Sequence, residues 1–254
     1  MDASNPFAQL LSDVGRSAKP RTDGLTIVID TGLGPHRVDD LASLVGAHVD
    51  QAKIAWASST VSGGLLAKLE QYRRHDIQPL LGGSLFEYAY IWGKLDLLES
   101  VVREHRCSIE ISDGVATVPR RDKLRWIETF AKYVPVLSEV GGKLAPHDLD
   151  WPAAIREELA AGARHVVVEG REIGPTGKDI QVDFVDRIVN AVEPRLLVFE
   201  ALERYQQSWL VRHLGPNVNL GNIRGDDVLM LECIRRGLKE QTMLETHARA
   251  RAGS

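Results

Sequence analysis

The chain has few of the residues that cross-link a protein or anchor it in a membrane. Only Cys107 and Cys233 are cysteines among 254 residues, and neither belongs to a CxxC pair. This argues against a disulfide framework or a thiolate metal site and is typical of a reducing cytoplasm. No apolar run approaches the roughly 18 residues that a membrane span needs, and the first residues lack the pattern of a secretory signal. A net charge of −4 gives no general attraction for nucleic acid or anionic membrane. We therefore expect a cytoplasmic protein whose partners are small molecules.

What the chain does have is a repeated alternation of a short apolar run and a helical pattern. The predicted strands are 26–30, 51–56, 78–82, 108–113, 135–140, 165–170, 196–201 and 218–222. The predicted helices are 38–48, 62–76, 87–105, 120–134, 150–162, 183–192, 203–214 and 226–239. Eight such units of about 30 residues predict an α/β fold, a single (β/α)8 TIM barrel over residues 21–242. We expect residues 1–20 to be a lead-in whose amphipathic piece, Phe7 to Val14, covers the bottom of the barrel. Residues 243–254 are predicted to be a flexible tail.

An open doubly wound sheet is the competing architecture. When such a sheet binds a dinucleotide, its first strand-to-helix turn usually carries three spaced glycines. Residues 32–37 lack the third glycine, and residues 174–179 have the wrong glycine spacing for a P-loop. Neither nucleotide motif is present, which favours the barrel.

Five acidic residues end five of the predicted strands: Asp30, Asp113, Glu139, Glu169 and Glu200. In a barrel these positions converge at the mouth, meaning the carboxyl ends of the strands with the loops that follow them. Carboxylates held close together repel one another unless cations neutralise them. Hard oxygen ligands favour Mg²⁺ or Mn²⁺ over zinc. For each residue alone, accepting hydrogen bonds from a neighbouring loop remains the alternative interpretation.

Basic residues and glycine turns are expected at the same mouth. Lys53 lies within an apolar strand, Lys143 follows the fifth strand, and Arg171 follows the sixth. Residues 82–84 (GGS) and 219–222 (NLGN) each join a strand to a helix, where exposed backbone N–H groups bind phosphate well. For the glycine pair, a tight turn that needs glycine for its backbone angles is the alternative.

Several motifs, in consistent order, resemble those of the phosphosulfolactate synthase family. They are GGSLFE at 82–87, EISDG at 110–114, SEVG at 138–141, EGRE at 169–172, FEA at 199–201, VNLGN at 218–222 and RRGL at 235–238. The resemblance covers roughly residues 20–242. It implies an Mg²⁺-dependent barrel enzyme that adds sulfite to phosphoenolpyruvate, giving (2R)-2-O-phospho-3-sulfolactate on one route to coenzyme M. It also implies a homo-oligomer, with a trimer as one form.

That reaction assigns expected roles to the residues. Attack of sulfite on the methylene carbon builds negative charge on the substrate carboxylate, which a bound cation stabilises. We expect Asp113, Glu139 and Glu169 to hold the metal and Lys143 to be the general acid. Lys53 and Arg171 are expected to contact the anionic reactants. The expected substrate-binding residues are Asp30, Gly83, Ser84, Glu172, Glu200, Asn219, Gly221 and Asn222.

The chain departs from the family pattern at the mouth. Thr31 stands where the family usually has lysine, and Gly142 replaces the first of two adjacent lysines. Loss of two cations weakens the case for sulfite and leaves two alternatives open. One is addition of another nucleophile to phosphoenolpyruvate or another enol phosphate. The other is a non-catalytic relative similar to a plant heat-stress-associated group, against which the intact carboxylate set argues.

Overall fold

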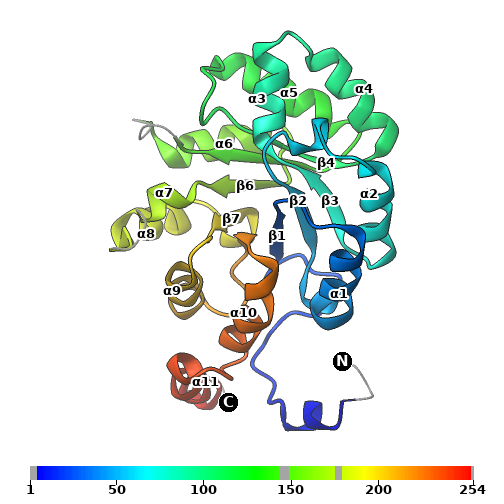
Figure 1. The fold of residues 1–254 in the computed structure, drawn as a ribbon. Coiled ribbons are helices and arrows are strands. Elements are labelled where there is room, and N and C mark those ends of the chain that lie inside the picture. Colours follow the sequence, from blue (N-terminus) through cyan, green and yellow to red (C-terminus); the bar gives the residue numbers. More distant parts are fainter. Residues whose placement is uncertain (1–4, 143–148, 175–178, 253–254) are drawn as a thin grey trace.

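A closed barrel of eight parallel strands forms the centre of the molecule (Figure 1). The computed structural model describes residues 5–142, 149–174 and 179–252. The strands are β1 Thr26–Asp30, β2 Gln51–Ile54, β3 Gln78–Leu81, β4 Ser108–Ile111, β5 Val136–Val140, β6 His165–Val168, β7 Leu197–Glu200 and β8 Leu220–Ile223. Each strand pairs with the next in sequence, and β8 pairs with β1 to close the ring. The prediction of a single (β/α)8 barrel is confirmed.

Helices surround the barrel (Figure 1). They are α1 Pro35–Val45, α2 Leu65–Arg74, α3 Gly83–Ile91, α4 Leu95–His105, α5 Arg120–Ala131, α6 Trp151–Ala160, α7 Gly170–Ile173, α8 Val182–Ala191, α9 Arg204–Leu214, α10 Val228–Arg235 and α11 Glu240–Ala252. Short 3₁₀ helices are η1 Pro6–Leu10, η2 Gly46–His48, η3 Ser58–Thr60, η4 Pro194–Leu196 and η5 Gly225–Asp227. In the part of the chain that the structure describes, no helix has the length and apolar character to cross a membrane.

Alternating side chains divide the apolar residues into two cores. One face of each strand packs against the helices, and this outer core is the larger. Inside the barrel a separate cluster contains Ile27, Leu80, Leu137, Val167 and Val198. Because this inner cluster fills the middle of the barrel, inward-facing polar groups lie at its two ends.

Several predicted boundaries differ from the structure, and three of these differences change the number or the placement of elements. The predicted helix 87–105 is two helices, α3 and α4, because Gly93 between them has a φ of +62° that interrupts the helix. The eighth strand begins at Leu220, two residues later than expected. The expected tail lies mostly in α11, which Arg212 of α9 contacts through its Nε, 2.9 Å from Glu245 Oε2.

The lead-in covers the bottom of the barrel with different residues from those expected. Phe7 and Leu10 are 75% and 80% exposed, so the predicted amphipathic piece does not pack against the barrel there. Arg16 is buried instead, and the Ser17 backbone N–H donates to Asn217 Oδ1 at 3.0 Å, just before β8. Polar contacts rather than an apolar face therefore attach the N-terminal segment.

Candidate active site at the carboxyl ends of the strands

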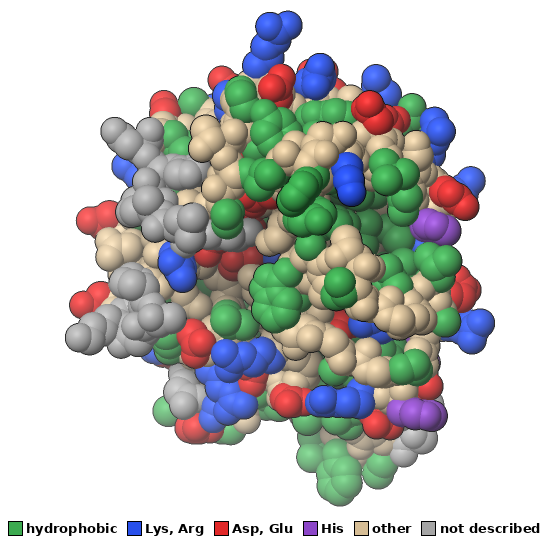
Figure 2. All heavy atoms as spheres, turned by 45° about the horizontal axis from the view of Figure 1, so that its top comes forward, with side chains coloured by type: hydrophobic (Ala, Val, Ile, Leu, Met, Phe, Trp, Pro, Cys, Tyr) green, Lys and Arg blue, Asp and Glu red, His purple; other side chains and the backbone are tan. Residues whose placement is uncertain are grey.

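Three buried glutamates from β4, β5 and β7 meet at the mouth. Glu110, Glu139 and Glu200 are at most 5% exposed, and one carboxylate oxygen from each lies within 4.8 Å of the others. All three occupy inward-facing positions above the apolar cluster of the barrel interior. Figure 2 shows acidic side chains in a hollow of the surface, with hydrophobic side chains along one side. The predicted convergence of strand-end carboxylates is therefore observed for Glu139 and Glu200.

Lys53 on β2 lies between two of these glutamates. Its Nζ is 3.0 Å from Glu110 Oε2 and 2.9 Å from Glu200 Oε1, and the residue is only 6% exposed. Burial alone would lower the pKa of Lys53, but the carboxylates of Glu110, Glu200 and Glu139 outweigh burial and raise this pKa above its ordinary value. Lys53 therefore carries a fixed positive charge at neutral pH.

The charges and donors of this cluster fit a hard divalent cation. Counted as three ionised carboxylates and one ammonium, the cluster has a formal charge of −2 in a buried space, which a divalent ion would balance. Carboxylate oxygens without imidazole or thiolate are the donor set that Mg²⁺ and Mn²⁺ prefer. Glu110, Glu139 and Glu200 are thus the described residues best placed to hold the expected metal.

The glycine pair after β3 positions Glu110. The Gly83 N–H donates to Glu110 Oε1 at 3.0 Å. A Cβ on Gly83 would lie 2.5 Å from Ser112 Oγ, so close approach rather than an unusual backbone angle requires glycine there. This N–H, which we expected to face a phosphate, is directed at a carboxylate of the cluster. Ser84 follows in the first turn of α3 and is partly buried.

Asp30, expected to bind substrate, is surrounded by donors from the protein itself. Its Oδ1 accepts from the backbone N–H groups of Gly32 and Leu33 at 2.8 and 2.7 Å. Its Oδ2 accepts from Tyr72 Oη at 3.0 Å and lies 2.8 Å from Lys68 Nζ. Burial and then the Asp30 carboxylate raise the pKa of Tyr72 above its usual value, so the phenol remains a donor. The structure therefore supports a local role for Asp30 in fixing the loop after β1.

Asp113, expected to hold the metal, is not part of the glutamate cluster. Its Oδ1 is 2.8 Å from Lys123 Nζ, on α5. The same ammonium donates to the Glu139 backbone carbonyl at 2.6 Å and lies 3.0 Å from Glu158 Oε1. Lys123 thus binds Asp113 away from the cluster and also holds the end of β5, from which Glu139 projects.

The residues after β6 line another side of the mouth. Glu169 is buried and accepts from the Arg171 backbone N–H at 3.3 Å. Glu172 accepts from the Gly142 N–H at 3.4 Å, which links the loops after β5 and β6. The side chain of Arg171 is exposed. Lys143, the expected general acid, lies outside the described residues.

The residues of the VNLGN motif divide between the two ends of the barrel. Asn222 has a φ of +56° and donates its amide to Glu200 Oε1, so it belongs to the mouth. Gly221 is beside Glu200 in the strand pairing. Asn219 instead accepts from the Leu25 N–H at 2.9 Å and donates to the Leu197 carbonyl at 2.8 Å, near the starts of the strands. Its expected place at the mouth is corrected, because β8 starts later than predicted.

Several buried charged residues near the mouth were missed from the sequence, among them Glu87, Glu110, Lys68 and Lys123. Lys68 and Lys123 lie on apolar stripes of their helices: Lys68 is four residues before buried Tyr72, and Lys123 is three and four residues before buried Trp126 and Ile127. A lysine at such a position is the signal that was available. Glu87 accepts from the Val115 N–H at 2.8 Å and so holds the loop after β4.

The chain is similar over most of its length to proteins of one family. The family described as (2R)-phospho-3-sulfolactate synthase (ComA) matches residues 14–241. A phosphosulfolactate synthase of Methanothermobacter thermautotrophicus is 33% identical over 246 residues, covering 90% of this chain and 94% of that protein. One of Bacillus subtilis is 33% identical over 239 residues, covering 89% and 95%.

This chain belongs to the phosphosulfolactate synthase family.

Solved structures outside the family share only the fold with this phosphosulfolactate synthase relative. The 3-hexulose-6-phosphate synthase of Salmonella typhimurium aligns with a TM-score of 0.56 at 13% identity, over 83% of this chain and 97% of that chain. The YdjI aldolase of Escherichia coli K12 aligns with a TM-score of 0.55 at 12% identity, over 88% and 90%. These matches support the barrel architecture independently of the family assignment.

Proposed function

We propose that this family member is a carbon–sulfur lyase that adds sulfite to phosphoenolpyruvate to give (2R)-2-O-phospho-3-sulfolactate, with Mg²⁺ as cofactor. One observation carries the proposal. A buried cluster of Glu110, Glu139 and Glu200 around Lys53 has a formal charge of −2 at the mouth of the barrel. A binding module has no evident need for such a cluster. Confining three carboxylates costs free energy, and binding a cation or catalysing a reaction is the reason to retain a cluster with that cost.

The described residues fix the cluster in one arrangement. Lys53 bridges Glu110 and Glu200, the Gly83 N–H holds the second oxygen of Glu110, and Asn222 holds Glu200. Mg²⁺ held by the three glutamates would supply positive charge next to the phosphoenolpyruvate carboxylate, where negative charge builds up as the carbon–sulfur bond forms. Fixed donors and low exposure make such stabilisation more effective than it would be in water.

Proton delivery is assigned to a different group from Lys53. The raised pKa of Lys53 makes its ammonium a weak acid at neutral pH, so it serves to fix charge and geometry. After sulfite has bonded to the methylene carbon, the adjacent carbon must still receive a proton. Lys143 remains our proposed donor on the basis of the family motif. Arg171, exposed beside Glu169, is proposed to contact an anionic reactant.

A second candidate function is favoured by where the other cations lie. Lys68 pairs with Asp30, and Lys123 pairs with Asp113 and Glu158, so neither replaces the lysines absent at Thr31 and Gly142. With fewer cations at the mouth, a nucleophile less charged than sulfite is the alternative reactant for phosphoenolpyruvate or another enol phosphate.

We also propose a homo-oligomer, which light scattering after size-exclusion chromatography would test.

The test is an assay of the purified protein with phosphoenolpyruvate, sulfite and Mg²⁺, followed by mass spectrometry. We expect an adduct that requires sulfite and disappears on chelation and in Glu110→Gln. Absence of the adduct where a known synthase forms it would overturn the sulfite assignment. An adduct with another nucleophile from the same panel would establish the second candidate.

A further inference from the structure

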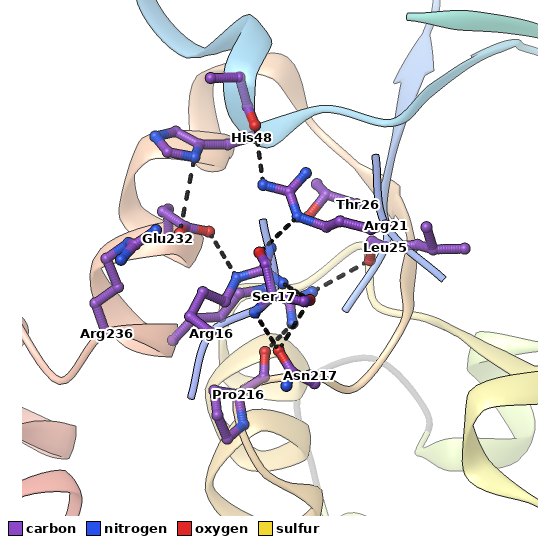
Figure 3. Close-up of polar contacts among 12 residues, drawn as sticks. Arg16, Ser17, Arg21, Leu25, Thr26, His48, Pro216, Asn217, Glu232 and Arg236 are labelled. Atoms are coloured by element: carbon purple, nitrogen blue, oxygen red, sulfur yellow. Dashed lines mark hydrogen bonds and ion pairs between the residues drawn. The ribbon is translucent and has the colours of Figure 1, made fainter. Parts of the chain in front are cut away.

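Both ends of the barrel already have an occupant. The mouth holds the proposed substrate site. At the opposite end the N-terminal segment covers the starts of the strands through polar contacts (Figure 3). Arg16 Nε lies 3.2 Å from Glu232 Oε2, and the Ser17 N–H donates to Asn217 Oδ1 at 3.0 Å. The outer helices are therefore the surface that remains for a partner.

The outer helices differ in how much apolar surface they expose. α2, α3 and α4 line one groove on the same side of the barrel (Figure 1). Six large hydrophobic side chains on these helices and at the end of α3 are between 41% and 63% exposed. We call them the α2–α4 face: Leu66, Tyr88, Ile91, Trp92, Leu97 and Val101. α5 and α6, all of whose residues the structure describes, expose no large hydrophobic side chain.

The sequence of α4 explains why this face is apolar. Leu95, Leu98 and Val102 recur at intervals of three and four residues and are buried. Leu97 and Val101, four residues apart, form a second apolar stripe that the barrel does not cover. A helix that only packs on its own barrel needs one such stripe. The second stripe is therefore available for a contact outside the chain.

A groove runs between the three helices. Its volume is about 410 Å³, and apolar side chains of α2, α3 and α4 form most of its lining. Leu66, Leu97 and Tyr88 belong to this lining. Trp92 lies beside the groove, because its ring centroid is 6.0 Å from that of Tyr88, and it is 63% exposed. The same chain thus carries a hollow and, next to it, an exposed side chain large enough to fill one.

The exposed apolar area is the amount that a stable contact between chains needs. With the usual areas of these side chains, the exposed fractions of the α2–α4 face amount to roughly 700 Å² per chain. The largest apolar patch on a typical monomer is about 300–600 Å². Covering the face on two chains would remove roughly 1,400 Å² from water, within the range of about 1,200–2,000 Å² for specific interfaces.

We propose that a second copy of this chain covers the α2–α4 face. The inference rests on the homo-oligomer proposed above and assigns the surface that forms it. Exposed apolar side chains of one copy, such as Trp92, fill the groove between the helices of the other. Burial of this apolar surface on both chains supplies the free energy of association.

The test is light scattering after size-exclusion chromatography, over protein concentrations from about 1 to about 100 µM. Leu66→Glu on α2 and Leu97→Glu on α4 each place a carboxylate in the lining of the groove. Each should raise the dissociation constant at least tenfold, because an unpaired charge is costly to bury against apolar groups. Leu44→Glu is the matched control, since Leu44 of α1 is 71% exposed and lies outside the face. Its mass should equal that of the unaltered protein.

Far-ultraviolet circular dichroism checks that every variant is folded. Leu66 and Leu97 are 55% and 63% exposed, so neither substitution alters the core of the barrel. Should a glutamate variant not fold, Leu97→Gln replaces it, with an expected rise in the dissociation constant of about threefold.

Three results would overturn the inference. If the unaltered protein is oligomeric and both face variants keep its mass, the contact lies elsewhere and the proposed homo-oligomer stands. If the unaltered protein has the mass of one chain at every concentration, the homo-oligomer is refuted as well and the face belongs to another partner. If Leu44→Glu dissociates together with the face variants, added charge rather than the face is the cause. None of these results bears on the lyase assay, because no residue of the face belongs to the glutamate cluster.

Discussion

Replacing Lys53 with methionine should remove the positive charge that offsets part of the repulsion among Glu110, Glu139 and Glu200. The ammonium lies 3.0 Å from Glu110 Oε2 and 2.9 Å from Glu200 Oε1. Methionine keeps the length of the side chain and removes the charge. The folded variant must then confine three carboxylates whose nearest oxygens lie within 4.8 Å of one another.

The expected loss of stability follows from these distances. At an effective dielectric constant of about 20, each contact near 3 Å contributes about 5 kcal/mol before desolvation is subtracted. Desolvation cancels much of this, and removing one partner of a buried ion pair typically costs about 3–5 kcal/mol. We therefore expect Lys53→Met to lower the free energy of unfolding by about 3–5 kcal/mol at about pH 8. The loss should shrink as pH falls. The folded variant then binds a proton on its glutamate cluster that the unfolded chain does not bind, and this difference stabilises the folded state more at lower pH.

Urea denaturation at about pH 5.5 and about pH 8, without divalent cations, measures both effects. Lys94→Met is the matched control, since Lys94 is exposed and should change stability by less than about 0.5 kcal/mol. A Lys53 variant as stable as this control at both pH values would refute the stabilising role of the Lys53 charge at the mouth. Addition of Mg²⁺ or Mn²⁺ should restore more stability to the Lys53 variant than to the unaltered protein.

Three further predictions concern separate parts of the barrel. Burial, and then Arg164, lower the pKa of His165 to about 4 from 6.5, so stability present above pH 6.5 should fall by up to about 3 kcal/mol as pH drops to 4. His165→Gln should flatten that part of the stability profile, and an unchanged profile would mean that another group titrates. Gly83→Ala should destabilise the folded protein by about 1–3 kcal/mol, because its Cβ would lie 2.5 Å from Ser112 Oγ. Gly63→Ala is the control, since a Cβ there meets open space and should leave stability unchanged. Equal melting temperatures of the two variants would contradict this prediction. Glu169→Gln should abolish product formation while the melting temperature changes little, and near-normal turnover would remove Glu169 from the site.

The sequence was sufficient to predict the barrel architecture, because the order of apolar and polar residues shows the periodicities of the strands and the helices. Eight alternating units could form few arrangements other than a barrel. The exact start of β8 was not predictable from that order. Val218 and Asn219 continue the apolar–polar alternation of the strand, and only the tertiary contacts of Asn219 with Leu25 and Leu197 place it before the strand.

The site was harder to predict because its members are distinguished by partners far away in the chain. Asp113 and Glu110 are both acidic and only three residues apart. Lys123 forms an ion pair with Asp113, whereas Glu110 faces the barrel axis and forms an ion pair with Lys53. The strand-end rule selected Asp113, since Glu110 lies within its apolar run. Side chains along β4 alternate between the inside and the outside of the barrel. Because Ile109 and Ile111 face the helices, this alternation would have selected Glu110.

Titration of the metal-free protein with Mn²⁺ tests the central claim most directly, because the ion can be followed by its own magnetic resonance signal. We predict one bound ion per chain, competition by Mg²⁺, and at least tenfold weaker binding in both Glu110→Gln and Glu139→Gln, with Asp113→Asn nearly unchanged. Undetectable binding, or binding lost in Asp113→Asn and retained in the two glutamate variants, would contradict the account.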